Sequence, residues 1–306
     1  MAQENTIQYL SHSQIDKPAW DKCIANAPNG LIYAHSYYLD YMATHWDALV
    51  LNNYEYAMPL PWRKKYGIYY LYQPAFVAQL GLFGNNITKE LLLNFLNAIP
   101  KKFRYWDFSL NHDNFFEIDR YPLHQRSNFV LSLHSSYNLL YSQYRENSKR
   151  NIKKAKSYGC YIKKDIAIDS VIQLAKQQVQ QSKTTETDFK NFVQLYSFLY
   201  QASKAISYGV CSREGEVLAS CVYFFSHNRA YYILVGNHPN GRTMGASHQL
   251  IDAFIKDHEE QNLLLDFEGS DIRNLAFFYS SFGAVEENYP AIRLNNLPWY
   301  AKWVKD

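Results

Sequence analysis

The feature that most constrains this chain is a pattern of residues that occurs twice. The first copy begins YEYAMPLPWRKKYGIYYLYQ (54–73), continues through TKELLLNFLNAI (88–99) and ends at RYWDFSL (104–110). The second begins GEVLASCVYFFSHNRAYYILVG (215–236), continues through ASHQLIDAFIKDH (246–258) and ends at LLLDFEGS (263–270). The Asp-Phe pairs of the two copies, at Asp107 and Asp266, lie 159 residues apart, about half of the 306-residue chain. Such self-similarity indicates a duplicated module, and the alternative is two unrelated units that share a common order of elements.

Each copy predicts the same series of elements. Runs of β-branched and aromatic residues between turn residues predict two strands joined by a short turn. The segment 246–258 places Leu250, Ile251, Phe254 and Ile255 on one helical face, and a strand that ends in Asp-Phe follows it. Antiparallel strands followed by a helix and a further strand predict a mixed α/β sheet.

We therefore expect an α/β fold (α+β mixed sheet) of two tandem modules joined by a helical connector. The first module is expected over residues 1–134, completed by the tail 290–306, and the second over 135–289, which includes the connector at 134–203. Within the connector, SKRNIKKAKSYG (148–159) predicts a basic helix that ends at Gly159. Further helices are predicted near 168–182, 188–202 and 272–281.

Composition excludes several classes of protein. Charged residues make up 19% of the chain and the net charge is +3, which favours a globular enzyme over a disordered chain or a dedicated DNA-binding protein. The cysteines at 23, 160, 211 and 221 form no CxxC pair, so we predict free, mostly buried thiols and no metal site. The segment MAQENTIQYL lacks the pattern of a signal peptide, and no run approaches the roughly 20 apolar residues of a membrane span. These observations predict a cytoplasmic protein without a transmembrane segment.

The segment VGNHPNGRTMGASHQL (235–250) is the most informative for chemistry. It predicts a strand, a loop and then a helix that begins near Gly245. The first N–H groups of a helix lack internal partners, and the helix dipole adds positive charge there, so this point favours a bound phosphate. Arg242 would add a charge-assisted contact, and Ala246 and Ser247 would contribute the first amide groups. The alternative is a solvent-exposed loop before an ordinary helix.

The string Arg242-Thr243-Met244-Gly245-Ala246-Ser247 resembles the [Gln/Arg]-x-x-Gly-x-[Gly/Ala] signature with which the GNAT superfamily binds the pyrophosphate of acyl-CoA. Over nearly the whole chain, the order of MPLPWRKKYGIYYLYQ, NIKKAKSYG, the Gly-Ala helix start and LDFEGSDIRNLAFFYSSFGA resembles the tandem-GNAT family. That family includes the Fem-type peptidoglycan aminoacyl transferases and their short bacterial relatives, which this chain resembles more closely.

The resemblance implies transfer of an acyl group from acyl-CoA, such as acetyl-CoA, to an amine on a small-molecule or precursor acceptor. Two alternatives remain open. One is Fem-type transfer of an amino acid from aminoacyl-tRNA to a peptidoglycan precursor, and the other is a non-catalytic binding protein with the same fold. The chain departs from the Fem-type pattern in two ways, because it has no long coiled-coil insertion for tRNA and it carries Tyr279 where a Lys is expected within Phe-Lys-x-x-Phe.

Acyl transfer to an amine needs a base and often an acid. Asp266-Phe267-Glu268 ends a predicted strand, where α/β sheets usually place their sites, and strand alternation predicts that Asp266 and Glu268 share a face. Glu268 is therefore the candidate base, although it or Asp266 would serve equally as a cap for the next helix. Tyr279 is the candidate acid, with a core position as the alternative. Arg273 is a candidate contact for an acidic acceptor, or else a partner of Asp271.

Two further sets of residues are candidate contacts. Polar side chains around Pro74, namely Tyr72, Gln73 and Gln79, predict a substrate groove in the first module, with a strand-end loop as the alternative. The basic helix carries Lys149, Arg150, Lys153, Lys154 and Lys156, which favour a phosphate-bearing partner such as CoA, a nucleotide-linked precursor, tRNA or a membrane surface. A solvated charged face is the alternative.

Overall fold

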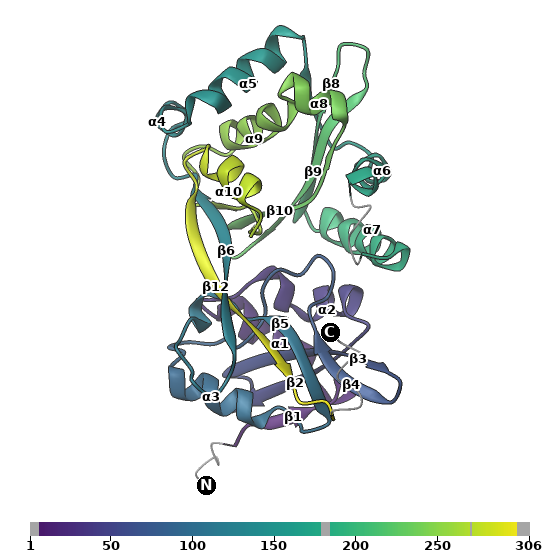
Figure 1. Cartoon of the computed structure of the whole chain (residues 1–306), viewed down its shortest axis with the longest axis vertical. Coiled ribbons are helices and arrows are strands. Elements are labelled where there is room, and N and C mark those ends of the chain that lie inside the picture. The colour runs from purple at the N-terminus through teal and green to yellow at the C-terminus, as the bar shows by residue number, and fades with distance from the viewer. Residues whose placement is uncertain (1–5, 179–183, 270, 299–306) are drawn as a thin grey trace. The chain divides into compact units, whose positions relative to one another are not determined.

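The computed structural model describes residues 6–178, 184–269 and 271–298 (Figure 1). The chain divides into two compact units. The first unit comprises the residues up to Arg126 together with those from Asn288 onward, and the second comprises Ser127–Glu287. The α/β class with mixed sheets that the sequence predicts is confirmed.

The first unit is built on a sheet of order β1-β2-β3-β4-β5-β12, in which only β4 and β5 are parallel among the pairs described. Its strands are β1 (Gln8–Leu10), β2 (His45–Leu51), β3 (Tyr56–Lys65), β4 (Ile68–Tyr72), β5 (Phe103–Ser109) and most of β12 (Val285–Asn295). Its helices are α1 (Lys17–Asn26), α2 (Ser36–Met42) and α3 (Lys89–Ala98), with 3-10 turns at His12–Gln14, Ile32–Ala34 and His112–Asn114.

Both faces of this sheet are covered by apolar packing. Helix α3 begins at a Thr88 cap, whose hydroxyl accepts a hydrogen bond from Leu91, and it buries Phe95 in the core with Trp106. On the other face Trp20 of α1 packs against Trp46 of β2, with ring centroids 5.2 Å apart. The alternation of side chains along each strand thus supplies two apolar layers.

The second unit is built on a sheet of order β6-β11-β10-β9-β8-β7, in which β10 and β11 are parallel. Its strands are most of β6 (Leu123–Ser132), β7 (Tyr161–Lys164), β8 (Ala205–Cys211), β9 (Val217–Ser226), β10 (Arg229–Asn237) and β11 (Leu264–Asp266). Its helices are α4 (Tyr137–Ser142), α5 (Glu146–Ser157), α6 (Ile168–Gln178), α7 (Glu186–Gln201), α8 (Pro239–Met244), α9 (Ala246–Asp257) and α10 (Arg273–Ser280).

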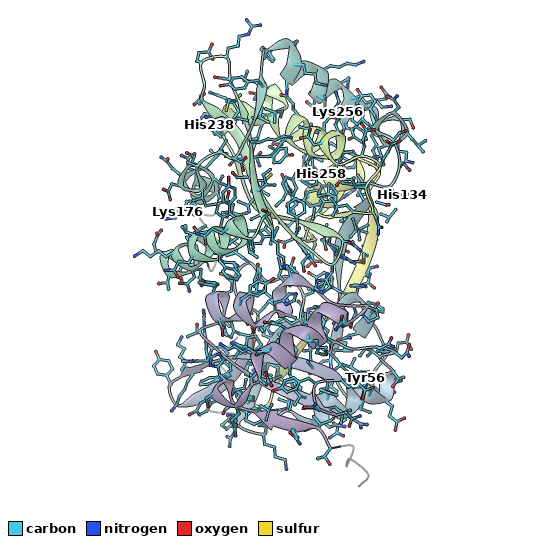
Figure 2. All side chains as sticks on the ribbon, turned by 180° about the vertical axis from the view of Figure 1, so that it is seen from behind. Tyr56, His134, Lys176, His238, Lys256 and His258 are labelled. Atoms are coloured by element: carbon cyan, nitrogen blue, oxygen red, sulfur yellow. The ribbon has the colours of Figure 1, made fainter. Side chains whose placement is uncertain are left out.

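Neighbouring residues of β9 show how this sheet is buried on both faces. Tyr223 stacks on Phe254 of α9, with ring centroids 3.7 Å apart. Phe224, on the opposite face, stacks on Phe192 of α7 at 5.4 Å. Figure 1 shows α5 and α9 over one face of the sheet and α6 and α7 over the other. At the end of α9, Lys256 is exposed, whereas His258 is half-buried against Phe254 (Figure 2).

The repeated order of elements is present in both units. The series β3, β4, α3, β5 in the first unit matches β9, β10, α9, β11 in the second. In each, the strand that carries the Tyr-Tyr pair lies parallel to the strand that contains the Asp of the Asp-Phe pair. The hairpin between β9 and β10 turns through His227 and Asn228, both left-handed with φ near 50°, as a two-residue hairpin turn requires.

The structure differs from the predicted helical connector at residues 161–164. This segment forms β7, which pairs antiparallel with the end of β8. Gly159, at φ 73°, ends α5 and redirects the chain, as predicted, and Ile162 then packs against the core of the second unit. Lys163 and Lys164 therefore lie on a strand at the edge of the sheet rather than on an extension of the basic helix.

The prediction of free, mostly buried thiols is confirmed, since all four thiols are free, three are buried and Cys23 is half-buried. Among the helices that the structure describes, none has the length and apolar character required to cross a bilayer.

Candidate functional site

The second unit contains a point at which two parallel strands separate. Strand β10 pairs with β11 only through Arg229, Ala230 and Tyr231, since β11 ends at Asp266. Beyond this point a bulge lies between Ile233 and Val235, and Leu234 takes a φ of 46°. The remaining residues, up to Asn237, pair with β9 alone among the pairs described. A bulge next to an unpaired edge redirects the strand, and such bulges are common beside active sites.

Aromatic side chains fill the base of this separation. Tyr232 of β10, Phe267 after β11 and Tyr279 of α10 are buried together. The rings of Phe267 and Tyr279 stack at 4.7 Å, and Tyr232 meets both edge-on, at 5.9 Å and 6.3 Å. Burial, followed by the charge of Glu268, raises the pKa of the Tyr279 phenol. The hydroxyl is protonated at neutral pH, as that of an ordinary tyrosine is, and its burial makes it a weaker acid.

The predicted phosphate loop has a different form in the structure. Residues Pro239–Met244 form the short helix α8, which has a proline in its first turn and is capped by the side chain of His238. Arg242 is exposed on that helix rather than in a loop. Gly245 then takes φ 84° and links α8 to α9, whose first residues are the buried Ala246 and the half-buried Ser247.

Gly245 serves helix packing as well as the turn. A side-chain carbon at this position would lie 2.4 Å from the carbonyl oxygen of Asn151 in α5. The glycine therefore allows α5 to approach closely, and this face of Gly245 is closed to a phosphate. Ser247 donates a hydrogen bond to the side chain of Asn237, which joins the end of β10 to the first turn of α9.

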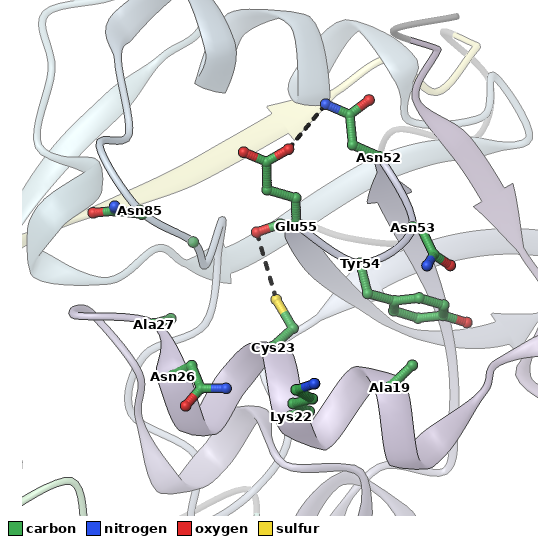
Figure 3. A pocket seen from close by; sticks show the side chains of 11 residues that line it. Ala19, Lys22, Cys23, Asn26, Ala27, Asn52, Asn53, Tyr54, Glu55 and Asn85 are labelled. Atoms are coloured by element: carbon green, nitrogen blue, oxygen red, sulfur yellow. Dashed lines mark hydrogen bonds between the residues drawn. The ribbon is translucent and has the colours of Figure 1, made fainter. Parts of the chain in front are cut away.

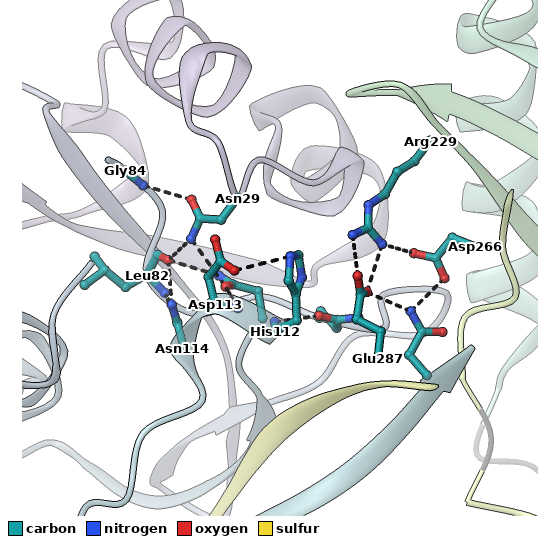
Figure 4. Close-up of polar contacts among 12 residues, drawn as sticks. Asn29, Leu82, Gly84, His112, Asp113, Asn114, Arg229, Asp266 and Glu287 are labelled. Carbon is teal, nitrogen blue, oxygen red and sulfur yellow. Dashed lines mark hydrogen bonds and ion pairs between the residues drawn. The ribbon is translucent and has the colours of Figure 1, made fainter. Parts of the chain in front are cut away.

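A buried network of charges holds the end of β11 (Figure 4). The Arg229 guanidinium lies 2.8 Å from a carboxylate oxygen of Asp266 and makes two bonds with Glu287, of 2.7 and 2.9 Å. Asn128 of β6 donates to the other oxygen of Asp266 at 3.0 Å. Burial raises the pKa of the Asp266 carboxyl, and the charge of Arg229 opposes that shift. This network links β6, β10, β11 and β12.

Asp266 and Glu268 do not share a strand face, contrary to the prediction. Strand β11 ends at Asp266, and Glu268 has a left-handed φ of 60°. The amide of Glu268 donates to Asp266 Oδ1 at 2.8 Å, so Asp266 positions Glu268 through its backbone. Asp266 is 2% exposed and is occupied by the charge network, whereas Glu268 is half-buried. Neither residue caps α10, which begins after Ile272.

The structure places His248, which is not among the candidate residues predicted from the sequence, beside α10. It lies in the first turn of α9, 4.8 Å from the ring of Phe278 and 5.8 Å from that of Phe282. Burial lowers the pKa of His248 to about 4, so its imidazole is neutral at pH 7. The only sign of His248 in the sequence was its place three residues after Gly245. Its apolar neighbours, Phe278 and Phe282, lie some 30 residues further along the chain and could not be predicted.

The polar residues predicted to line a groove in the first unit hold a loop together. Gln73 accepts from the amide of Ser109 and donates to Val77 O, each at 2.8 Å. Gln79 is 1% exposed and accepts from the amide of His112 at 3.0 Å. Tyr72 is buried, and its hydroxyl accepts from the amide of Thr44. These contacts agree with the alternative interpretation of this segment, in which the polar residues belong to a loop at the end of a strand.

The remaining predicted residues lie on the surface of the second unit. Arg273 is exposed at the first position of α10. Helix α5 is confirmed over Glu146–Ser157, where Lys149 pairs with Glu146 at 3.1 Å. The part of the chain that the structure describes provides no ion-pair partner for three exposed cations of α5: Arg150, Lys153 and Lys154.

The comparisons with known proteins bear on this same region. Residues 142–271 match the family model described as an acetyltransferase (GNAT) domain. The second unit contains a GNAT-type domain. The sequence has no significant match among curated proteins.

Three solved structures share the fold over most of the chain. FemX is 12% identical, with 98% of this chain and 100% of FemX covered and a TM-score of 0.67. The C-terminal domain of a putative lysylphosphatidylglycerol synthetase from Agrobacterium fabrum is 8% identical, with 94% of both chains covered and a TM-score of 0.54. L-PGS from Bacillus licheniformis is 10% identical, with coverage of 85% and 87% and a TM-score of 0.51. At these identities the likeness establishes a FemX-like GNAT fold.

The buried charge network yields a test of stability. Arg229→Met leaves the buried carboxylate of Asp266 and the half-buried carboxylate of Glu287 without their partner, so the free energy of unfolding of the second unit should fall by about 3–5 kcal/mol. Lys176→Met is the matched control, because Lys176 (Figure 2) makes an exposed pair with Glu186 and should change stability by about 1 kcal/mol or less. Urea denaturation measures both. Equal losses in the two variants would show that the Arg229 network does not stabilise the unit.

The position of His248 yields a pH dependence. Its pKa is about 4 in the folded chain and about 6.5 in an unfolded one, so between these values the unfolded chain binds an additional proton. Stability should therefore fall by up to about 3 kcal/mol as pH drops from 6.5 to 4. His248→Leu should remove this component in denaturation curves recorded across that range. The exposed His134→Leu (Figure 2) controls for the loss of an imidazole, and an unchanged pH slope in His248→Leu would contradict the assignment.

Proposed function

We propose that this chain is an acyl-CoA-dependent N-acyltransferase whose acyl donor binds in the second unit, beside the free edge of β10. The observation that carries the proposal is the separation of β10 from β11 after Tyr231, next to the first turn of α9 and within the GNAT-type domain. A strand edge with unpaired amide and carbonyl groups offers hydrogen bonds to an extended ligand. Acyl-CoA, when bound, supplies an activated thioester.

The residues available for the donor phosphates are those around the start of α9. Arg242 is exposed and carries a full positive charge for a charge-assisted contact. Ala246 and Ser247 hold the first-turn amide groups, which have no acceptor within the helix. Gly245 forms the turn between α8 and α9. It is not itself available to a phosphate, because the side on which a side chain would stand packs against α5.

Two groups beside the separated strands match the chemistry of acyl transfer to an amine. Glu268, fixed by the bond from its amide to Asp266, would accept the proton that the attacking amine loses. Tyr279, protonated at neutral pH, would donate a proton to the leaving thiolate. Arg273, exposed at the start of the same helix as Tyr279, is available to an acidic group of the acceptor.

Donor binding is the first test. Isothermal titration of acetyl-CoA and free CoA into the full chain should give micromolar binding, and Arg242→Glu should weaken it at least about tenfold by replacing a phosphate contact with a repulsion. Arg120→Glu, the same charge reversal at an exposed position of the first unit, should leave the affinity unchanged. Absence of binding to either compound would reject the CoA proposal.

That negative result would favour aminoacyl-tRNA as donor. The observation that supports this second candidate is the row of exposed cations on α5, where Arg150, Lys153 and Lys154 have no ion-pair partner in the described residues. Such a row attracts a nucleic-acid backbone electrostatically, and binding of this kind weakens steeply with salt. If neither donor bound, the remaining interpretation would be a non-catalytic binding protein.

The catalytic assignment is tested once an amine acceptor has been found by screening. Glu268→Gln removes the base but keeps the shape of the side chain, so kcat should fall about 10²–10⁴-fold while donor affinity is retained. The control is Glu260→Gln, which changes an exposed residue that also has a left-handed φ. Steady-state kinetics distinguish the two variants, and a kcat within twofold of the parent value would exclude Glu268 as the base.

A further inference from the structure

The two units differ at the place that the proposed donor occupies. In the second unit, β10 runs past the end of β11 to Asn237 and stays paired with β9. In the first unit the equivalent strand, β4, ends at Tyr72, and the chain leaves the sheet. The edges of β3 and β5 beyond Tyr72 would therefore be open to an extended ligand if nothing took the place of β4.

A returning segment of the chain, residues 80–83, takes that place. Phe83 exchanges two backbone hydrogen bonds with Ala57 of β3, at 2.8 and 3.0 Å. The amide of Leu80 donates to the carbonyl oxygen of Ser109 in β5 at 3.1 Å. The segment is thus bonded to β3 on one side and to β5 on the other.

Two prolines of β3 explain why β4 ends where it does. The bonds of Ala57 to the returning segment lie on the side of β3 that faces β4, because the opposite side pairs with β2. Alternate residues of a strand point their backbone groups to the same neighbour, so Pro59 and Pro61 also face this side. Proline has no N–H to donate, so the β3–β4 ladder cannot continue past Pro61. Strand β9 of the second unit contains no proline, and β10 continues along it.

Three buried asparagines bond the polar groups of the returning segment (Figure 4). Asn29, Asn111 and Asn114 are 1% exposed or less, and they donate to Leu82 O at 2.9, 2.9 and 3.0 Å. Asn114 also accepts from the amide of Leu82 at 2.7 Å, and Asn111 donates to Leu80 O at 3.0 Å. These backbone groups are therefore occupied within the fold and are not offered to a ligand.

The segment leaves the sheet through a close contact at Gly84. A side-chain carbon at this position would lie 2.4 Å from the ring of Tyr56, the first residue of β3. The next residue, Asn85, borders a depression beside α1 (Figure 3). The backbone at Gly84 thus lies against the Tyr56 ring, with no room for a ligand between them.

We propose that residues 80–84 close the first unit to an acyl donor, so that one chain binds a single donor, in its second unit. An extended ligand beside β10 meets an unpaired strand edge, whereas the corresponding place in the first unit already holds a segment of the chain itself. The identity of the donor rests on the proposed function. The closure rests only on contacts within the first unit.

The number of donor sites is measured by isothermal titration of acetyl-CoA into the full chain. We expect one acetyl-CoA for each chain, because only the second unit offers an open strand edge at this place. Two for each chain would overturn the proposal.

Hydrogen–deuterium exchange with mass spectrometry tests the closure itself. Hydrogen-bonded amides exchange only when the structure around them opens, so residues 80–84 should exchange at least about tenfold more slowly than the exposed turn at 66–67. Saturating acetyl-CoA should slow exchange over 232–237 and leave 80–84 unchanged. Exchange over 80–84 as fast as that of the turn, or slowed by acetyl-CoA, would overturn the proposal.

A pair of variants tests how the segment is held. Asn111→Ala removes the donor to two of its carbonyl groups and should speed exchange over 80–84, whereas Asn94→Ala, at an exposed position of α3, should not. Thermal melting confirms that each variant is folded. Unchanged exchange in folded Asn111→Ala would contradict its part in the closure, and if that variant does not fold, exchange in the parent chain still decides.

The two proposals fail separately. Absence of acetyl-CoA binding would reject the acyl-CoA donor, and exchange over 80–84 in the free chain would then still decide whether the first unit is closed. Two acetyl-CoA molecules for each chain would overturn the closure and leave the acyl-CoA donor in place.

Discussion

The second unit depends on one buried charge network, in which Arg229 is held between Asp266 and Glu287. Removing three charged groups from water costs several kcal/mol for each, so the arrangement is tolerated only because each charge meets its partner and Asn128 satisfies a further oxygen. These residues come from four strands whose register must be correct for the charges to meet. The network therefore specifies which strands are neighbours, and it also fixes the backbone that carries Glu268.

The candidate donor site follows from this constraint. Because Asp266 ends β11 within the network, β11 is short, and β10 continues past it with a free edge. Aromatic rings exclude water from the base of the separation and leave a protonated phenol beside a carboxylate. The close approach of α5 at Gly245 supports the start of α9 from behind. Within the string that resembles the family signature, Gly245 therefore contributes to helix packing, whereas Arg242 on α8 is exposed and carries a charge.

Local patterns predicted the order of the elements, since alternation, helical periodicity and turn residues are written in short stretches of sequence. The basic helix and its end at Gly159 are examples. Contacts between residues far apart in the sequence could not be predicted. The partners of Arg229 lie 37 and 58 residues further along the chain, so its burial could not be foreseen from the turn in which it occurs. Strand β7 was missed because its lysines suggested a continued charged surface, and α8 was missed because Pro239, at its start, was interpreted as part of a loop.

The order in which the chain is synthesised has consequences for how the two units are completed. Strand β5 ends at Ser109, yet its neighbour on one side, residues 291–295, is made about 180 residues later. Glu287, which neutralises Arg229, is made nearly as late. At roughly 5–20 residues per second, the edge of β5 stays unpaired for about ten seconds or more, and an unpaired edge is prone to intermolecular pairing. The usual completion of an N-terminal unit during its own synthesis is thus unavailable to the first unit, and both units close only after β12 has been made.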